Sequence, residues 1–423
     1  MGAGLLTERA ALLQEIARQV GTPVYVYDAA AIERQYRVLS DALAPAPHRI
    51  FYSVKANSNL AVLGLLRRLG AGADIVSGGE LARVLRAGFP PAEIVFSGVG
   101  KTAAELEAAL DAGIGAINVE SRAELEQLEQ LARRRDAIAR FGIRVNPDVE
   151  PVTHPYTQTG TRDHKFGVPH DQVVSLLQWA LKQPALELVG VGMHIGSQIA
   201  DAAPYRAGAR RLGELVAAAR DAGANTLRHV DVGGGIGIRY MNEPALEADV
   251  FAGAVTQLAD ETGLPLAVEP GRFLLGNAGL LLARCLYRKE AGHKDFVIVD
   301  AGMNDLLRPS LYGAAHEVRV IDGADRGGEG RVDVVGPVCE SGDFLALDRE
   351  LPGAVPGALL AILGAGAYGF TMSSSYNSRP RAAEVLVDGG RWAVVRERET
   401  ADDLMRGEHT MDDLDAGGWR ERA

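Results

Sequence analysis

The segment IFYSVKANSNLAVLGLLRRLGAGADIVS, residues 50–77, holds one complete unit of a pattern that continues to about residue 271. The unit opens with a short β-rich run (50–56), continues with a stretch of helical character, and closes on a second β-rich run (73–77). Eight such strand-like runs, nearly continuously apolar and separated by helical stretches, favour a closed parallel (β/α)8 barrel, although an open doubly wound sheet shows the same alternation. The six further runs are EIVFSG (93–98), AINVE (116–120), FGIRVNP (141–147), LVGVGMHIGS (188–197), HVDVGGG (229–235) and LAVEPG (266–271).

Polar residues near the C-terminal ends of these runs favour the barrel over the open sheet. A single polar residue there is ordinarily a turn former, but here every run has a polar residue or glycines late in the strand. Active sites of parallel barrels gather side chains from the C-terminal ends of several strands, so we expect one shared site. Its candidate members are Lys55, Asp74, Ser97, Asn118, Asn146, His194, the glycines 233–235 and Glu269.

Beyond about residue 280 the sequence predicts a second domain. β-rich runs and turns follow one another there without helix-length amphipathic stretches between most of them, which indicates a mainly antiparallel β-domain. The strand-like TPVYVYD (22–28) precedes the barrel and is expected to pair with that domain. We thus predict an α/β protein with an N-terminal segment (1–30), a barrel (31–278) and a C-terminal β-domain (279–423).

The composition excludes several classes of function. The chain has 423 residues, 47% hydrophobic and 23% charged, which allows a large core and argues against disorder. A net charge of −11 disfavours nucleic acid or an anionic membrane as partner. The longest apolar stretches, such as 279–283, fall far short of the roughly 20 residues of a membrane span. The N-terminal residues do not resemble a signal peptide, and two cysteines imply no disulfide framework, so we expect a cytoplasmic protein.

Lys55, in FYSVKANSN (51–59), is the first candidate for chemistry. A lysine near the end of an apolar strand ordinarily extends its amine to solvent. The alternative is a lysine that binds a carbonyl cofactor covalently, which needs a protected amine whose pKa its surroundings can lower. From the residue alone, only its position at the end of a strand supports the second interpretation.

Two turns contain groups that could bind a ligand: one could bind an anion, and the other could bind a ring nitrogen. DVGGGIGI (231–238) lacks the G-x-G-x-x-G spacing of dinucleotide-binding turns, but consecutive glycines let backbone N–H groups approach a phosphate. A simple tight turn is the alternative. In EPGR (269–272) we expect Glu269 to point inward and Arg272 to lie at the rim, unless the two form an ordinary surface ion pair. A carboxylate that faces a pyridine nitrogen keeps it protonated, which makes the ring an electron sink.

His194 and Cys339 are two further candidates. No HxH, HExxH or CxxC spacing supports a metal site, so His194 is either a core histidine or a ring placed against a flat cofactor. Cys339 lies in PVCESGD (337–343), followed by Glu340 and Asp343, acids that indicate a polar, accessible loop and a protonated thiol suited to proton donation. Cys285, in the apolar LLARCLY, is expected in the core.

Together these motifs resemble the diaminopimelate decarboxylases, a family of fold-type III enzymes that depend on pyridoxal 5′-phosphate (PLP). The resemblance runs from about residue 20 to 408, and the number of motifs in the family's order makes it specific. The motifs are GTPVYVYD, YSVKAN, DIVSGGEL, RVNPDV, THPYTQTG, KFG, HIGSQ, GGGIG, EPGR, DAGMNDLLRPSLY, GPVCESGD and GAGAYG.

The resemblance implies a role for each matching residue. The residues that would contact PLP are Lys55 (covalently), His194 (stacked on the ring), Ser197, Gly234, Gly235, Glu269 (at the ring nitrogen), Pro270, Gly271, Arg272 and Tyr368. Those that would contact the substrate are Arg272, Arg308, Tyr312, Glu340 and Tyr368. Lys55 and Cys339 would be catalytic, with Cys339 protonating the carbanion from the second subunit of a homodimer with shared active sites.

The implied reaction converts meso-2,6-diaminopimelate to L-lysine and CO2, the last step of lysine biosynthesis. The distal end of this small amino-acid substrate is a zwitterion, so arginines suit its carboxylate and Glu340 suits its ammonium. A related decarboxylase of ornithine, arginine, lysine or carboxynorspermidine is the nearest rival, but substrates without a distal carboxylate would not need Arg272 and Arg308 together. A racemase would need two opposed proton-transfer groups in one site, and non-catalytic PLP-binding homologues are usually bare barrels.

Overall fold

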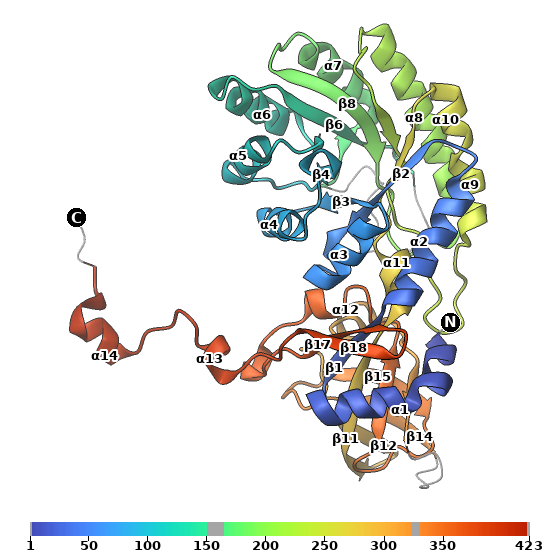
Figure 1. Cartoon of the computed structure of the whole chain (residues 1–423), viewed down its shortest axis with the longest axis vertical. Coiled ribbons are helices and arrows are strands. Elements are labelled where there is room, and N and C mark those ends of the chain that lie inside the picture. Colours follow the sequence, from blue (N-terminus) through green and yellow to red (C-terminus); the bar gives the residue numbers. More distant parts are fainter. Residues whose placement is uncertain (1, 150–164, 323–329, 421–423) are drawn as a thin grey trace.

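The computed structural model describes residues 2–149, 165–322 and 330–420, and it joins a barrel to a β-sheet domain (Figure 1). The barrel strands are β2 (His48–Ser53), β3 (Gly72–Ile75), β4 (Ile94–Phe96), β5 (Ala116–Val119), β6 (Ala139–Asn146), β8 (Leu186–Met193), β9 (His229–Asp231) and β10 (Leu266–Val268). Every neighbouring pair is parallel, and β10 pairs with β2, so the sheet closes on itself. The closure confirms the predicted barrel and excludes the open doubly wound sheet.

Helices cover the outside of the barrel (Figure 1). They are α2 (Ala29–Leu43), α3 (Leu60–Arg68), α4 (Gly78–Arg86), α5 (Ala103–Ala112), α6 (Arg122–Arg134), α7 (His170–Ala180), α8 (Ala203–Asp221), α9 (Ala248–Val255) and α10 (Gln257–Thr262). Three of them begin with a hydroxyl that caps the first turn, from Ser77, Thr102 and Ser121. Each of these caps has a glutamate three residues later. Glu105 also accepts a hydrogen bond from the N–H of Gly78, the first residue of α4, at 2.8 Å, which joins the starts of α4 and α5.

Each observed strand ends before the matching β-rich run in the sequence ends, because the run continues into a loop at the mouth. Lys55 lies in a 3-10 turn, η1 (Val54–Ala56), directly after β2, and Glu269 directly follows β10. Glycines on β8 leave room for polar side chains inside the barrel. A Cβ on Gly192 would lie only 2.7 Å from the Cβ of Asp231 on β9. The carboxyl group of Asp231 therefore fits beneath the mouth only because β8 presents no side chain there.

The second sheet is mainly antiparallel. Its strands are β1 (Val24–Asp28), β11 (Gly279–Ala291), β12 (Lys294–Val299), β13 (Val318–Val320), β14 (Arg331–Val335), β15 (Phe344–Glu350), β16 (Leu359–Leu363), β17 (Ala383–Asp388) and β18 (Arg391–Arg396). β1 is antiparallel to β11 and parallel to β17, so a strand from the start of the chain lies inside the C-terminal sheet. α1 (Gly2–Val20) packs on this sheet through Leu13 and Ile16.

Of the remaining short elements, α12 (Arg308–Tyr312) lies between the two domains (Figure 1). α13 (Ala401–Leu404) and α14 (Met411–Asp413) extend away from both domains. A two-residue strand, β7 (Val168–Pro169), extends the edge of β6. None of the helices in the described ranges is both long enough and apolar enough to cross a membrane.

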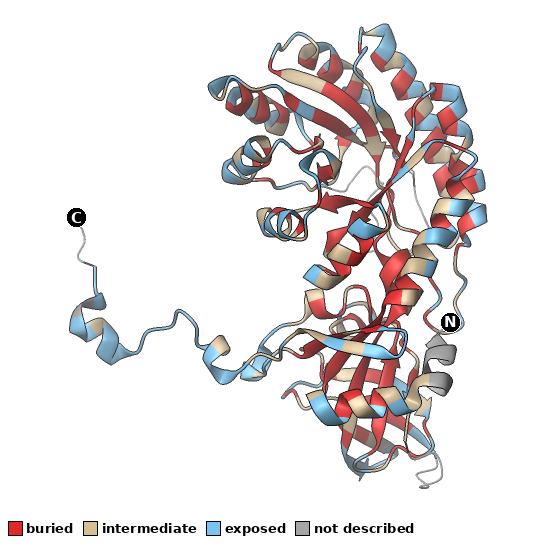
Figure 2. Cartoon of the chain, viewed as in Figure 1, coloured by how far each residue is buried: buried red, intermediate tan, exposed pale blue. Residues whose placement is uncertain are grey.

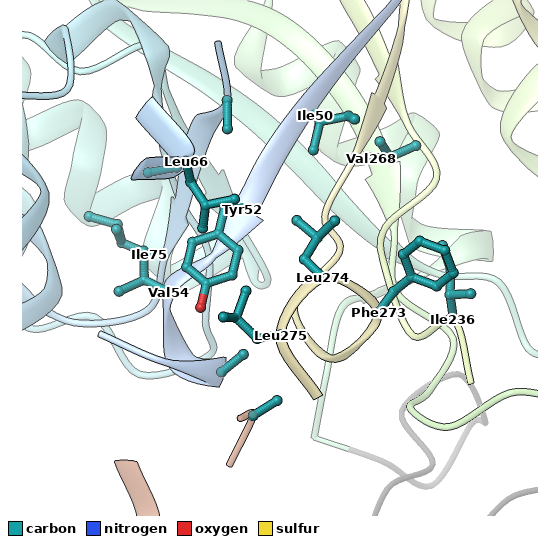
Figure 3. Close-up of a cluster of buried hydrophobic side chains, with 14 of the residues drawn as sticks. Ile50, Tyr52, Val54, Leu66, Ile75, Ile236, Val268, Phe273, Leu274 and Leu275 are labelled. Atoms are coloured by element: carbon teal, nitrogen blue, oxygen red, sulfur yellow. The ribbon is translucent and has the colours of Figure 1, made fainter. Parts of the chain in front are cut away.

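Buried residues continue from the barrel across the junction into the sheet (Figure 2). Figure 3 shows part of this junction, where Tyr52 and Val54 lie beside Leu275 of α11 (Arg272–Leu275). The carboxylate of Glu384, on β17, is fully buried there. It accepts hydrogen bonds from the Tyr27 hydroxyl of β1 at 2.7 Å and from the Asn59 amide of the barrel at 3.0 Å, and it pairs with Arg396. One carboxylate thus connects the two domains.

We predict that Glu384→Ala lowers the free energy of unfolding by about 3 kcal/mol, because it leaves Arg396, Tyr27 and Asn59 without their shared acceptor. Asp388→Ala is the matched control on the same strand. Asp388 pairs with Arg391 at the surface, so its loss should cost no more than about 0.5 kcal/mol. Urea unfolding at fixed protein and PLP concentrations measures both. Equal effects of the two variants would contradict the role given to Glu384.

Candidate active site

A cavity of about 550 Å³ opens between the barrel mouth and the β-domain. A second cavity of about 460 Å³ adjoins it, and the two share Lys55, His194 and Glu269. The structure therefore brings residues from distant parts of the sequence to one place. The predicted residues that line the first cavity are Lys55, His194, Ser197, Gly235, Glu269, Pro270, Gly271, Arg272, Arg308, Tyr312 and Tyr368.

The Lys55 ammonium lies at the meeting point of the two cavities. It donates a hydrogen bond to the Asp74 carboxylate at 2.9 Å, and the Ser53 hydroxyl donates to the same carboxylate at 2.9 Å. Burial lowers the pKa of Lys55. The electrostatic attraction of Asp74, Tyr368 and Glu269 for the ammonium raises it by more, so the pKa of Lys55 lies above its ordinary value. The expectation of a lowered pKa is wrong for this arrangement, because three anionic or ionisable oxygen groups surround one amine.

Two buried carboxyl groups lie beside Lys55. Glu269 and Asp231 are both buried, and the charge of Asp231 opposes ionisation of Glu269. Burial first, then the neighbouring Asp231 and Asp74, raise the pKa of Glu269 well above its usual range. Burial also raises the pKa of Asp231 to about 6. Glu269 thus points inward as predicted, and it belongs to a pair that the sequence did not reveal.

His194 carries no charge in this structure. Its Nδ1 accepts a hydrogen bond from the Gly234 N–H at 3.3 Å, so any ring proton is on Nε2. Burial, together with the charges of Arg144 and Lys55, holds the pKa of His194 well below its usual value. The ring is therefore neutral and faces both cavities.

The glycine turn after β9 is required for close packing as well as for a ligand. A Cβ on Gly234 would lie 2.0 Å from the Glu269 carbonyl oxygen, and one on Gly235 would lie 2.1 Å from the Gly196 carbonyl oxygen. Gly235 also has a φ of +92°, which side chains rarely adopt. The Gly234 N–H is used by His194, whereas among the hydrogen bonds of the described residues none uses the Gly235 N–H. Gly235 lines the cavity, so its N–H is the donor that suits an anion.

Two buried arginines form the opposite wall. Arg272 donates to the Tyr240 hydroxyl at 2.5 Å and to the Ser197 hydroxyl at 2.9 Å. Arg308, on α12, lies 4.4 Å from the Tyr240 ring centre and donates to His316 Nε2 at 2.8 Å. Because the other ring nitrogen of His316 donates to the Leu363 carbonyl at 2.7 Å, that histidine is neutral, and burial with Arg308 lowers its pKa to about 3.

Tyr368 connects this wall to the turn that carries Lys55. Its backbone N–H donates to the Ala56 carbonyl at 2.8 Å, and its ring lies 4.8 Å from the Arg272 guanidinium. Its φ of +56° is unusual for a residue with a large side chain. Such strain persists only where the surroundings impose it, and here it places the ring in the cavity.

Cys339 and Glu340 do not line either cavity. Both are exposed, which confirms the accessible loop predicted for Cys339, whereas Cys285 is buried as expected. The Cys339 N–H donates to the Asn377 side chain at 2.9 Å, and Tyr376 is hydrogen-bonded to Glu340. One chain therefore leaves these two predicted residues on its surface, away from Lys55.

Acidic and basic side chains both line the site. Asp74, Asp231 and Glu269 lie around Lys55, while Arg272 and Arg308 line the larger cavity beside Tyr240 and Tyr368. Within the described ranges, Arg272 Nε, Arg308 Nε and Asp74 Oδ1 are buried and make no hydrogen bond. A ligand with a cationic ring nitrogen at one end and anionic oxygens at the other satisfies both groups. PLP has this distribution of charge.

Residues 29–276 match the family model of the pyridoxal-binding domain of pyridoxal-dependent decarboxylases. The chain belongs to this class of enzyme. It is 50% identical over 402 residues to the diaminopimelate decarboxylase of Pseudomonas aeruginosa, covering 94% of this chain and 95% of that protein. The Aquifex aeolicus diaminopimelate decarboxylase is 46% identical over 393 residues, 92% of each chain.

Solved structures of related proteins indicate the same class of enzyme. The diaminopimelate decarboxylase of Helicobacter pylori, complexed with L-lysine, is 41% identical with a TM-score of 0.90, covering 96% of this chain and all of that one. A lysine/ornithine decarboxylase from Vibrio vulnificus has a TM-score of 0.79 at 22% identity, covering 91% of this chain and 99% of that one, which shows the shared fold alone. Within its class, the chain is a member of the diaminopimelate decarboxylase family, which are PLP-dependent carboxy-lyases.

Four residues of the site were not identified from the sequence as functional. Asp231 lies in the glycine motif but was not distinguished from it, and Tyr240 and His316 lie in regions without a recognisable pattern. Arg144 lines the second cavity, where Glu120 holds it at 2.9 Å. The sequence could have indicated this arginine, because it lies in the RVNP motif at the C-terminal end of a barrel strand, β6. The motif THPYTQTG (153–160) lies outside the described residues.

We predict that Gly235→Ala weakens PLP binding by about tenfold or more, because the positive φ and the contact with the Gly196 carbonyl both displace the turn. Gly253→Ala is the matched control, since a Cβ on Gly253 meets nothing within 4 Å. Spectrophotometric titration of each cofactor-free variant with PLP gives the dissociation constants. Unchanged affinity in Gly235→Ala would show that this turn does not hold the phosphate.

Proposed function

We propose that this chain converts meso-2,6-diaminopimelate to L-lysine and CO2 with PLP as its cofactor. The observation that carries the substrate assignment is the pair of buried arginines, Arg272 and Arg308, in the cavity that Lys55 also lines. Diaminopimelate has an amino-carboxylate group at each end, so one end reacts while the other must be bound as a zwitterion. A guanidinium pair is suited to the carboxylate of that second end.

The residues around Lys55 fit the cofactor. Lys55 is the amine that would hold PLP, and its proton can pass to the Asp74 carboxylate to which it is hydrogen-bonded. The neutral His194 ring would lie against the cofactor ring, and Glu269 would face the ring nitrogen, supported by Asp231. Bound PLP supplies the electron sink for the carbanion that loss of CO2 leaves.

The anionic end of PLP would lie on the side of the glycine turn. Gly235 offers a backbone N–H there, with Gly234 beneath it and Ser197 beside it. The segment Pro270–Arg272 lines the same side of the cavity, and the α11 backbone begins at its end. A phosphate at this place would accept from Gly235 and meet the charge of Arg272.

The distal carboxylate of the substrate would be held by Arg308, with Tyr312 and Tyr368 beside it. His316 supports this role, because it accepts from Arg308 and so fixes the guanidinium without neutralising its charge. Among the described residues that line the cavity, none offers a comparable partner for the distal ammonium. Glu243 lines it, but both of its oxygens already accept backbone N–H groups, of Tyr240 at 2.6 Å and Met241 at 3.0 Å.

Glu340 and Cys339 would complete the site from a second copy of the chain. In one copy both are exposed and outside the cavities. In a two-fold dimer each loop would enter the mouth of the other barrel, so that Glu340 binds the distal ammonium and the Cys339 thiol donates the proton that completes lysine. The chain would thus work as a homodimer with shared active sites.

We predict that Arg308→Ala raises KM for diaminopimelate by about 30-fold or more, since the distal carboxylate loses its buried partner. Arg319→Ala, which removes an exposed arginine paired with Glu317 in the same domain, is the control and should leave KM unchanged. Coupled assay of lysine and CO2 measures both. The substrate assignment fails if the unmodified enzyme decarboxylates lysine or ornithine more efficiently than diaminopimelate.

Mixed dimers test the shared site. Homodimers of Lys55→Ala and of Cys339→Ala should each be severely impaired. If the two are unfolded and refolded together in equal amounts, about half of the dimers are mixed, and each mixed dimer has one intact site. Activity should then recover to roughly a quarter of the unmodified level. Absence of recovery, with mixed dimers verified by mass, would place both residues in the site of one chain.

A further inference from the structure

The Asp343 carboxylate lies between two loops, one of which carries Cys339. Asp343 is buried, and its Oδ2 accepts a hydrogen bond from the Val338 N–H at 2.6 Å. Its Oδ1 accepts from the Met303 N–H, also at 2.6 Å. Each oxygen thus holds a different loop, and the Val338 N–H belongs to the residue directly before Cys339.

The backbone of Asp343 closes the same loop. Its N–H donates to the Glu340 carbonyl at 3.1 Å, and its carbonyl accepts from the Gly336 N–H at 3.2 Å. The segment 336–343 therefore folds back on itself, with Cys339 and Glu340 at its tip. Burial raises the pKa of Asp343, while the two N–H donors favour its charged form. An ionised carboxylate is the group that can accept from both loops at once.

Two glycines make space for this carboxylate. A Cβ on Gly336 would lie 2.5 Å from Asp343 Oδ2 and equally close to the Cα of Gly302. A Cβ on Gly302 would lie 3.0 Å from Asp343 Oδ1. The two loops cross at the glycines, and the carboxylate is enclosed at the crossing. A polar residue that only contacted solvent would not need two glycines to make room for it. The enclosure of the carboxylate therefore indicates that it holds the two loops together.

The second loop leads directly to the substrate wall of the same chain. It continues from Met303 into α12, which carries Arg308 and Tyr312. The Ser310 hydroxyl of that helix donates to the Gly342 carbonyl at 2.6 Å. The helix that lines the cavity of one chain is therefore bonded to the loop that would serve the other chain.

We propose that Asp343 is a positioning residue that sets the Cys339–Glu340 tip for the active site of the partner chain. The inference rests on the shared site proposed above. Asp343 lines neither cavity, so it does not touch the cofactor or substrate bound by its own chain. Its effect on the reaction is in trans: Asp343 of one chain controls proton delivery and ammonium binding at the Lys55 site of the other.

The test uses heterodimers of two differently tagged chains, purified through both tags. One chain carries Lys55→Ala and the other Cys339→Ala, so that a single site remains, with Lys55 from the second chain and Cys339 from the first. Asp343→Asn is then added to one chain or the other. Asn keeps the shape of Asp but presents an N–H group to one of the two N–H donors, which releases one loop.

Asp343→Asn on the Lys55→Ala chain should lower kcat of the surviving site by about tenfold or more, since a misplaced group costs this much even without loss of the residue. The same substitution on the Cys339→Ala chain should lower kcat several-fold less, because its Cys339 loop serves the dead site and only its Met303 loop belongs to the surviving one. PLP affinity should be unchanged in both. Gly302→Ala, whose Cβ would lie 3.0 Å from Asp343 Oδ1 and 2.9 Å from Asn304 Oδ1, is a milder variant that should give the same asymmetry if Asp343→Asn does not fold.

Equal losses from the two placements would overturn the inference, since a general defect of folding does not depend on which chain carries it. A larger loss on the Cys339→Ala chain would also overturn it, because Asp343 would then act on its own site. If the reference heterodimer without Asp343→Asn is inactive, the shared site itself is wrong, and this inference falls with it. If the reference heterodimer is active and both placements lose the same activity, only the role of Asp343 is rejected and the shared site stands.

Discussion

Three carboxyl groups and one ammonium group meet in the buried centre of the barrel mouth, and the rest of the site follows from how their charges are balanced. Asp74, Asp231 and Glu269 cannot all ionise beside a single Lys55 without a large cost of burial. The chain lowers this cost by pairing Lys55 with Asp74 and by raising the pKa values of Glu269 and Asp231, which favours their neutral forms. A ring nitrogen that carries a proton next to Glu269 would supply the missing positive charge. The site therefore has more carboxyl groups than ammonium groups before PLP binds, and the protonated ring nitrogen of PLP would balance them.

The separation of charge depends on the joining of two domains. The barrel provides the acids, because the C-terminal ends of its parallel strands point to one side. The positive wall comes from both sides of the junction, with Arg272 following β10 and Arg308 on α12. Tyr240 and His316 hold these arginines through contacts that leave their charges unneutralised. An acidic partner at the same places would have cancelled the charge that a carboxylate substrate requires.

Much of the fold and of the site could be predicted from the sequence, since the βα alternation and the strand-end residues are local patterns. The barrel, the mainly antiparallel sheet and the positions of Lys55 and Glu269 follow from them. Arg272 was expected at the rim, and this is wrong: it is buried, because Tyr240 and Ser197 hold its guanidinium inside the cavity. The sequence could not reveal the raised pKa of Lys55, because it depends on Asp74, Glu269 and Tyr368, which only the folded chain brings together. The sequence also could not show why position 234 must be glycine. A Cβ there would meet the Glu269 carbonyl, and only the folded chain brings these two segments, 35 positions apart, together.

A crystal structure of the enzyme with PLP and L-lysine would test most directly whether each site combines the charged cavity of one chain with the Cys339 loop of another. Lysine retains the distal end of diaminopimelate, so its α-carboxylate should lie within hydrogen-bond distance of Arg308 in the chain whose Lys55 is next to PLP. Its α-ammonium should lie within the same distance of Glu340 of the partner subunit. A complex in which the α-ammonium is bound by an acid of the same chain, with both Cys339 loops remote from the cofactors, would contradict the account.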